Sequence, residues 1–259
     1  MNRLFLFLCL LAISIACEAQ HIVYRMDRRP PADIFARGFV PPGRDNNLYL
    51  HVIGETCYDA SRTSGFVATT SDQNFARDWG SETVAPGQHF YIYRMRPTAR
   101  FVPTTISLMR AHDMTQNPVY RMAANTFVEQ REWASHGPIP ANSIIDAHEY
   151  ISRGPLIAPE RVTLHRNARF VQAQSTMRAD PYVWDYADDD PDAPARSDAT
   201  CASCFGGTIL FGKHGADPLA RHTIANVLAC RRRVNDQMSA LMNLFDDTPI
   251  VEEKWREKE

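Results

Sequence analysis

Short segments typical of strands and of helices alternate irregularly along residues 21–172, without a regular strand–helix–strand period. Between His21 and Asp27 apolar and polar side chains alternate, which predicts a strand with one buried face. Residues 114–133 are ambiguous between helix and strand. Further strands are predicted at Phe66–Thr69, His89–Met95, Ile144–Ile151 and Ala168–Gln172. This irregular mixture predicts a mixed α+β fold through about residue 180.

The predicted helices are short and have recognisable end signals. Pro30 and Pro31 begin one helix, and Gly38 is placed to close it in the left-handed conformation. The Ser71 hydroxyl can cap a second helix over residues 72–79. Both helices are therefore expected to be brief elements set among the strands.

The charge balance argues against a nucleic-acid partner. Lys and Arg number 28 and Asp and Glu number 30, so the 259 residues have a net charge of −2 and offer no general attraction to a polyanion. No segment after the N-terminal region is apolar enough to span a membrane, so stable membrane insertion is not expected.

The first 19 residues are typical of a cleavable signal peptide. Arg3 is followed by thirteen uncharged residues, a run too short for a membrane span of about 20 residues. Small residues at Cys17 and Ala19 suit cleavage before Gln20. The alternative is a lipoprotein with Cys17 as its lipid-bearing first residue, although Ser14 stands where a branched apolar residue is usual. The sequence therefore predicts a secreted protein.

Removal of the signal peptide leaves four cysteines, Cys57, Cys201, Cys204 and Cys230. An even number in an oxidising compartment predicts two disulfides, but four cysteines allow three pairings and the sequence does not choose among them. A metal site at Cys201 and Cys204 with two nearby histidines is the alternative. The histidine spacing fits no zinc pattern well, so no metal is expected.

The C-terminal part of the chain differs in character from the rest. Residues 181–199 are rich in aspartate and poor in apolar residues, which predicts an exposed acidic linker. Within residues 200–259, Asp217 can cap a helix that begins at Pro218 and continues with apolar residues at spacings of three and four to Phe245. This predicts an amphipathic helix of about 28 residues, roughly 42 Å long.

Common catalytic motifs are absent from the sequence. There is no glycine-rich phosphate loop, His-Glu-x-x-His helix or Gly-x-Ser-x-Gly motif. A cysteine hydrolase built on Cys57 is an alternative, although an exported cysteine among three others is more often bridged. A second candidate set combines a cation, an imidazole, hydroxyls, an amide and a carboxylate: Arg25, His51, Thr69, Thr70, Gln130 and Glu132. Taken singly, each of these has an ordinary structural explanation.

These residues belong to motifs that follow one another in a specific order between Val23 and Gln172. The motifs are Tyr24-Arg25-Met26-Asp27, Arg29-Pro30-Pro31, His51 with Gly54 and Cys57, Phe66-Val67-Ala68-Thr69-Thr70-Ser71, and Glu132-Trp133. In this order and register the chain resembles the catalytic subunits of pertussis-like toxins, which are mono-ADP-ribosyltransferases of the glycosyltransferase class. The resemblance implies the mixed α/β ADP-ribosyltransferase fold over residues 20–180.

The resemblance implies that NAD is the substrate and that Glu132 is the catalytic carboxylate. Loss of nicotinamide passes through an oxocarbenium-like state, and a carboxylate that faces the developing cation stabilises this state more than the ground state. Gln130 lies two residues earlier, so on a strand both side chains would share a face, and Gln130 can orient the nucleophile. His51 is expected to hydrogen-bond the substrate or Glu132.

The remaining candidates are implied to bind NAD. Arg25 can pair with a phosphate or hold the adenosine ribose, because a guanidinium offers a fixed fork of donors. Asp27, from the same motif, is also expected to bind NAD. Thr69 and Thr70 are expected to brace the strand of Glu132 and the NAD.

Three positions bear on how closely this chain follows the family. Ala68 stands where the family has a serine, which removes a hydroxyl donor beside the catalytic strand. Pro42 stands where the family has a tryptophan in the nicotinamide loop, so a stacking surface there must come from another residue or be absent. Gln130 in place of glutamate resembles the pertussis branch and points away from an arginine acceptor.

The resemblance also implies partners and a place of action. It implies the A subunit of a secreted bacterial AB-type toxin, with a heterotrimeric G-protein α subunit as the host acceptor. The helix within residues 200–259 is expected to dock on a pentamer of receptor-binding B subunits, and the alternative is that it packs on its own domain. Cys57 is implied to pair with Cys204, whereas Cys201 and Cys230 bridge each other or hold another subunit. Reduction in the host cytosol is then expected to activate the enzyme.

A non-catalytic adaptor is the alternative from another functional class. Such a subunit would keep the same fold but only dock onto the pentamer or onto a second effector. Ala68 and Pro42 are the two features that favour this alternative.

Overall fold

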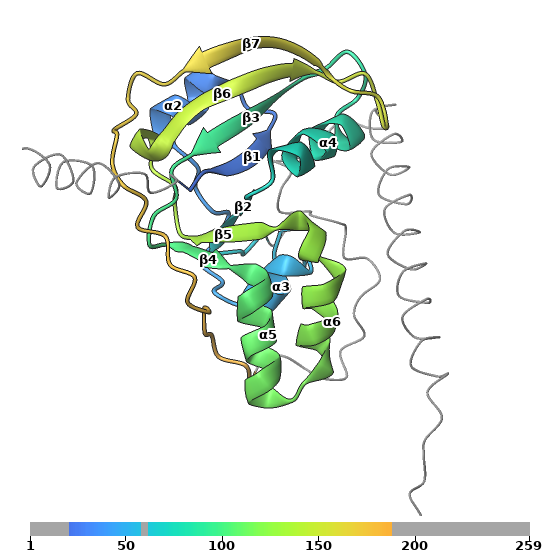
Figure 1. Cartoon of the computed structure of the whole chain (residues 1–259), viewed down its shortest axis with the longest axis vertical. Coiled ribbons are helices and arrows are strands. Elements are labelled where there is room, and N and C mark those ends of the chain that lie inside the picture. Colours follow the sequence, from blue (N-terminus) through green and yellow to red (C-terminus); the bar gives the residue numbers. More distant parts are fainter. Residues whose placement is uncertain (1–20, 58–61, 188–259) are drawn as a thin grey trace, which may run out of the picture.

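The computed structural model describes residues 21–57 and 62–187, shown in colour in Figure 1. Its strands form one antiparallel sheet in the order β4-β5-β2-β1-β3-β6-β7. The strands are β1 (Val23–Asp27), β2 (Phe66–Thr70), β3 (His89–Met95), β4 (Phe101–Pro103), β5 (Glu132–His136), β6 (Ile144–Ile151) and β7 (Glu160–Arg166). The helices are α2 (Pro31–Arg37), α3 (Leu48–Val52), α4 (Gln73–Thr83), α5 (Thr104–Thr115) and α6 (Pro118–Thr126), with short 3-10 turns η1 (Val128–Gln130) and η2 (Ala141–Ser143).

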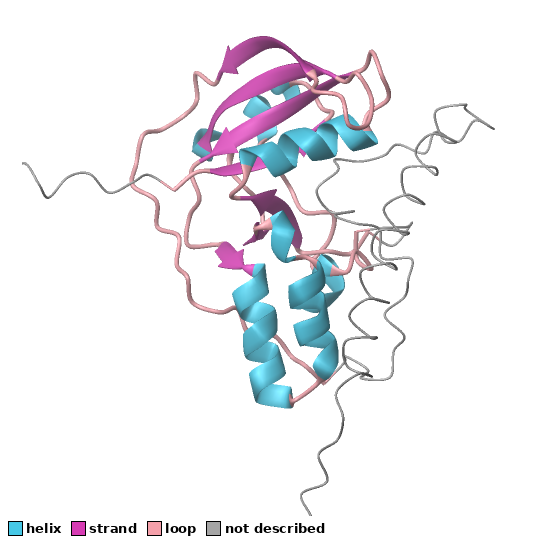
Figure 2. Cartoon of the chain, turned by 45° about the vertical axis from the view of Figure 1, so that its right-hand side comes forward, coloured by secondary structure: helices cyan, strands magenta, loops and turns pink. Residues whose placement is uncertain are grey.

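The helices cover two parts of this sheet (Figures 1 and 2). Helices α3, α5 and α6 pack beside β2 and β5 around a core that includes Leu48, Phe66 and Tyr120. Helix α4 packs on β1, β3 and β6, at the other end of the molecule. Between the two parts, β1 and β2 share one register pair, Tyr24 with Thr70. The candidate site lies at this narrow junction.

Strand β1 is buried on both faces, so the prediction of one buried face is wrong. Val23, Arg25 and Asp27 on one face are 1%, 6% and 0% exposed, and Met26 on the other is 2% exposed. The reason is topological, because β1 lies between β2 and β3 and is covered by side chains from both sides. Two polar side chains of the Tyr-Arg-x-Asp motif are therefore buried in the core.

The ends of the first two predicted helices differ from expectation. Gly38 has a positive φ of 75° but a ψ of −164°, so α2 does not close in the left-handed helical conformation. A Cβ at Gly38 would lie 2.1 Å from the carbonyl oxygen of Ile139, which excludes a side chain there. Helix α4 is capped by Asp72, whose carboxylate accepts the amide hydrogens of Asn74 and Phe75.

The last strand of the sheet lies earlier in the chain than the sequence pattern predicts. Strand β7 covers Glu160–Arg166, whereas the predicted strand Ala168–Gln172 forms a turn and an irregular segment. Strand β7 is at the sheet edge and is almost wholly exposed, so its residues are mostly polar. The ambiguous residues 114–133 contain the end of α5, α6, η1 and the start of β5.

The beginning of the predicted acidic linker is packed rather than exposed. Trp184 is 6% exposed and contacts the rings of Tyr120 and Tyr186 at centroid distances of 5.8 and 4.7 Å. Tyr182 also packs against the core of α3, α5 and α6. The acidic composition of the segment predicts exposure, but its three aromatic residues pack on the core. The folded domain therefore extends into the predicted linker, to residue 187 at least.

Replacing Trp184 by alanine is expected to lower the free energy of unfolding by about 3 kcal/mol, because a buried indole and its ring contacts are lost. Replacing Val183 by alanine is the matched control, since Val183 is 57% exposed, and a change within about 0.5 kcal/mol is expected. Urea titration followed by far-UV circular dichroism measures both values. Equal stability of the two variants would show that this segment is not part of the cooperative domain.

Several predictions concern residues outside the described part of the chain. They are the signal peptide over residues 1–19, the acidic stretch after residue 187, the pairing of Cys201, Cys204 and Cys230, and the amphipathic helix. Among residues 21–57 and 62–187, none of the helices has the length and apolar character needed to cross a membrane.

Candidate active site

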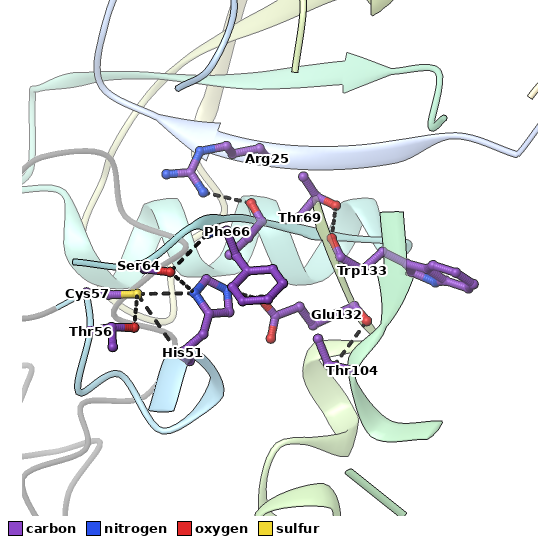
Figure 3. Close-up of polar contacts among 11 residues, drawn as sticks. Arg25, His51, Thr56, Cys57, Ser64, Phe66, Thr69, Thr104, Glu132 and Trp133 are labelled. Atoms are coloured by element: carbon purple, nitrogen blue, oxygen red, sulfur yellow. Dashed lines mark hydrogen bonds and ion pairs between the residues drawn. The ribbon is translucent and has the colours of Figure 1, made fainter. Parts of the chain in front are cut away.

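The short helix α3 delivers an imidazole to the interior of the domain. The Asn47 side chain caps this helix by accepting the amide hydrogen of Leu50 at 3.0 Å. The helix buries Leu48, Tyr49 and Val52 in the core, and His51 is itself only 1% exposed. His51 therefore points inward towards β2 and β5, as Figure 3 shows.

His51 and Glu132 form a buried hydrogen-bonded pair. The Nε2 atom of His51 lies 3.1 Å from Oε1 of Glu132, and Nδ1 lies 2.8 Å from Oγ of Ser64 (Figure 3). Glu132 is 5% exposed and Ser64 is fully buried. The Thr104 hydroxyl donates to the carbonyl oxygen of Glu132 at 3.2 Å, which holds the backbone at the start of β5.

The hydroxyl motif of β2 fixes the strand that carries Glu132. Thr69 donates its hydroxyl hydrogen to the carbonyl oxygen of Trp133 (Figure 3). Thr70 lies opposite Glu132 in the β2–β5 register, and its hydroxyl oxygen accepts the amide hydrogen of Asp72. Both threonines are fully buried, so they hold the backbone around the site.

Arg25 lies beside this strand and is held by one hydrogen bond and one ion pair. Its Nη1 donates to the carbonyl oxygen of Ala68 at 2.7 Å, and its Nε lies 3.6 Å from Oδ2 of Asp27. Burial lowers the pKa of Arg25 to about 10, although the Asp27 carboxylate opposes this effect. Arg25 therefore remains protonated at neutral pH. The bond to Ala68 uses a main-chain oxygen, so it does not depend on the side chain at that position.

Asp27 is fully buried and serves the two arginines of the motif. Its carboxylate accepts from Nε and Nη2 of Arg29 at 2.9 and 2.7 Å, and from the Arg29 amide. Burial alone would raise the pKa of Asp27, but the hydrogen bonds from Arg29 and the charges of both arginines outweigh it, so the pKa is lowered. Both guanidinium groups lie 5.5 Å from the centre of the Phe39 ring. Asp27 thus positions Arg25 and Arg29.

Gln130 and Glu132 do not share a face of one strand, so that prediction is wrong. Gln130 ends the turn η1, and Arg131 has a left-handed conformation with φ 45° and ψ 43°. The strand begins only at Glu132. Ser71, predicted as a helix cap, instead donates from its amide and its hydroxyl to the Arg131 carbonyl. Ser71 therefore helps to hold the turn that separates the two side chains.

Cys57 brings a disulfide to the edge of the site. It is disulfide-bonded, and its Sγ lies 3.4 Å from Nδ1 of His51 (Figure 3). The other cysteines of the chain lie outside the described residues, so its pairing with Cys204 stays a prediction. Within residues 21–57 and 62–187, no group of three or more His, Cys, Asp or Glu is arranged to hold a metal ion.

Ser64 and Arg29 are the site residues to which the sequence alone assigned no role. Arg29 belongs to the Arg29-Pro30-Pro31 motif, but its contacts with Asp27 depend on the turn between β1 and α2. Ser64 precedes β2 and carries no recognisable motif signal. Its proximity to His51 arises from the parallel bridge between Asp45 and Ser64, which joins two loops.

Comparison with known families shows to which family the chain belongs. Residues 18–190 match the family model of pertussis toxin, subunit 1, and so include the whole described part of the chain. The chain belongs to the pertussis toxin subunit 1 family. The resemblance seen in the sequence motifs is thereby confirmed.

Individual relatives agree with this family membership. Pertussis toxin subunit 1 of Bordetella pertussis is 29% identical over 175 residues, which are 62% of this chain and 64% of that protein. The pertussis toxin subunit 1 homolog of Bordetella bronchiseptica has the same identity and coverage. This chain therefore matches these relatives over less than two thirds of their length.

Solved structures share the fold. EcPltA has a TM-score of 0.52 and 27% identity, over 64% of this chain and 98% of that chain. Full-length CARDS toxin has a TM-score of 0.52 and 22% identity, over 63% of this chain and 31% of that chain, and its likeness concerns the fold alone. The expected fold, the mixed α+β fold of the ADP-ribosyltransferases, is confirmed.

Proposed function

We propose that this chain is the catalytic A subunit of a secreted AB-type toxin, and that it transfers ADP-ribose from NAD to a protein of the host cell. The observation that supports this best is the buried hydrogen bond between His51 and Glu132, 3.1 Å long, next to Arg25. Membership in the pertussis toxin subunit 1 family supports the same reaction. NAD is consumed as a substrate in this proposal.

Glu132 is assigned the role of stabilising the transition state. When the bond between nicotinamide and ribose breaks, its electron pair leaves with nicotinamide and positive charge develops on the ribose ring. An ionised carboxylate beside the ring stabilises that charge more than it stabilises NAD, so the barrier falls. One oxygen of Glu132 contacts His51, and the second is assigned to a ribose hydroxyl.

Arg25 and Gln130 are assigned to the two partners of the reaction. Arg25 is buried, protonated and fixed by Ala68 and Asp27, which suits recognition of the phosphates or ribose of NAD. Gln130 stands on the turn that precedes the strand of Glu132, and from there it is assigned to the incoming nucleophile. Thr69 and Thr70 support the site through the backbone, and their contact with NAD stays a prediction.

A heterotrimeric G-protein α subunit is the proposed acceptor, and residues 200–259 are the proposed docking segment for a pentamer of B subunits. Both proposals rest on family membership. The disulfide of Cys57 supports activation by reduction in the host cytosol, since its sulfur contacts the imidazole that binds Glu132. Reduction changes the chemistry of this sulfur and removes a covalent restraint beside the site.

A labelling experiment tests this function directly. Chain lacking residues 1–19 is incubated with labelled NAD and a mammalian cell lysate, with and without reductant, beside the same chain carrying Glu132→Ala. A labelled band is expected only with the unmodified, reduced protein, and that band identifies the acceptor. Equal labelling without reductant would contradict redox activation while leaving the transferase function intact.

The adaptor hypothesis predicts a different outcome of the same experiment. Neither protein would label a band or release nicotinamide, and Glu132→Ala would keep any biological effect. Ala68 and Pro42 favour this alternative, but the contact from Arg25 to the Ala68 carbonyl preserves one anchor at that position.

A further inference from the structure

A chain of hydrogen bonds with a defined direction begins at a backbone amide and ends at Glu132. The amide of Phe66, the first residue of β2, lies 3.1 Å from Oγ of Ser64. Oγ of Ser64 lies 2.8 Å from Nδ1 of His51, and Nε2 of His51 lies 3.1 Å from Oε1 of Glu132 (Figure 3). All three side chains are buried, with exposures of 0%, 1% and 5% along the chain.

The Phe66 amide at one end and the Glu132 carboxylate at the other determine which atom donates each hydrogen bond. A backbone amide can only donate, so the Ser64 oxygen accepts from Phe66 and its single hydrogen is available for Nδ1 of His51. An ionised carboxylate can only accept, so the hydrogen bond between His51 and Glu132 forms only in the tautomer with hydrogen on Nε2. A neutral imidazole with its hydrogen on Nε2 satisfies both contacts at once.

Ser64 itself is held in place by its backbone. Its amide donates to the Thr56 carbonyl at 3.1 Å, and its own carbonyl accepts from the Gly43 amide at 2.8 Å. The next residue, Gly65, lies so close to Asp45 that an added Cβ would be 2.7 Å from the Asp45 carbonyl oxygen. Backbone contacts therefore hold the Ser64 hydroxyl beside His51.

We propose that Ser64 is a positioning residue that fixes the tautomer of His51, so that Nε2 donates to Glu132. Cys57 Sγ, 3.4 Å from the same Nδ1, is part of a disulfide and has no hydrogen to donate, so Ser64 is the donor of these two neighbours. Without the Ser64 hydroxyl, Nδ1 loses this donor and the hydrogen is free to move from Nε2 to Nδ1. The hydrogen bond to Glu132 would then be lost. This inference rests on the proposed function of the same site.

The test measures the tautomer and the reaction separately in the full-length chain. Nitrogen NMR of the imidazole distinguishes hydrogen on Nε2 from hydrogen on Nδ1, and the His51→Asn variant assigns the signals. Nicotinamide release from NAD measures the reaction in reductant, and the spectra are recorded with and without it. The variants are Ser64→Ala, Ser64→Thr, which keeps the hydroxyl, and Ser135→Ala as the control. Ser135, on β5, is equally buried, but its hydroxyl donates to the Gly137 carbonyl.

Ser64→Ala is expected to shift hydrogen from Nε2 to Nδ1 in the spectra recorded without reductant, where the Cys57 sulfur has no hydrogen to donate. In reductant the Cys57 thiol is only a weak donor, and Ser64→Ala is expected to lower kcat by about 30-fold, with KM for NAD changed less than about threefold. Ser64→Thr is expected to restore both readouts, and Ser135→Ala to change neither. The proposal is overturned if Ser64→Ala keeps the hydrogen on Nε2 in the spectra recorded without reductant, whatever its activity. It is also overturned if the tautomer changes in reductant and kcat measured in reductant does not. If the unmodified chain releases no nicotinamide, the proposed function fails, and the spectra alone decide the tautomer.

Discussion

Replacing Glu132 by glutamine is expected to lower kcat for nicotinamide release by about 10³-fold, a loss of about 4 kcal/mol in transition-state stabilisation. Glutamine has the shape of glutamate and keeps an oxygen that can accept from Nε2 of His51, so the fold should be preserved. It lacks the negative charge that the oxocarbenium-like state needs. KM for NAD is expected to change far less than kcat, because the lost interaction strengthens only as positive charge develops.

Glu129→Gln is the matched control for this prediction. Glu129 is exposed in η1, three residues from Glu132, and the substitution removes the same charge from the same loop region. Its turnover is expected to stay within about twofold of the unmodified chain. Nicotinamide release is measured under saturating NAD, and urea titration shows whether both variants are folded. A Glu132→Gln variant that is folded and keeps more than a tenth of the activity would remove Glu132 from the proposed catalytic role.

Replacing Asp27 by asparagine is expected to lower the free energy of unfolding by about 4 kcal/mol. The change leaves Arg25 and Arg29 without the carboxylate that neutralises them, and Arg25 is 6% exposed. An asparagine amide would also direct donor hydrogens at guanidinium groups that can only donate. Urea titration at pH 7 measures the loss. The control is Asp113→Asn on the exposed surface of α5, where a change within about 0.5 kcal/mol is expected.

The pH dependence of stability provides a second test of Asp27. Because its pKa is lowered in the folded state, the ionised carboxylate stabilises the fold above the pKa of the unfolded chain, about 4. That contribution is lost as the pH falls from about 4 through the lowered folded-state value. The unmodified chain should therefore lose stability over this range more steeply than Asp27→Asn. Parallel curves for the two proteins would show that Asp27 is not the titrating group.

The position of the Cys57 sulfur gives the proposed redox activation a structural route. The sulfur lies 3.4 Å from Nδ1 of His51. The second nitrogen of the same ring, Nε2, binds the proposed catalytic carboxylate of Glu132. A thiol can donate to this nitrogen, whereas a disulfide sulfur cannot. Reduction therefore alters the surroundings of His51 as well as the attachment of Cys57 to the rest of the chain. Ser64 is placed to hold the tautomer of His51 in both redox states.

The local sequence pattern correctly predicted the strands whose own residues have the composition of a buried strand. The strands at residues 66–70, 89–95 and 144–151 have the β-branched and aromatic content that a buried strand requires, and they are present. Strand β7 was missed because an exposed edge strand needs few apolar residues. The segment around Trp184 is packed, contrary to prediction, because three aromatic residues contact the core although the segment as a whole is acidic. Composition averages over a segment, whereas packing depends on particular side chains.

The sequence by itself predicted the family and the fold class, and it indicated Arg25, His51, Thr69 and Glu132 as candidate site residues, because motif order and spacing are properties of the chain alone. The tertiary structure decided what each residue contacts. Burial on both faces of β1 makes Asp27 a partner of arginines, and the left-handed Arg131 separates Gln130 from the strand of Glu132. Ser64 meets His51 through loops that are brought together only when the chain is folded. Such contacts join residues far apart in the sequence, so no local pattern records them.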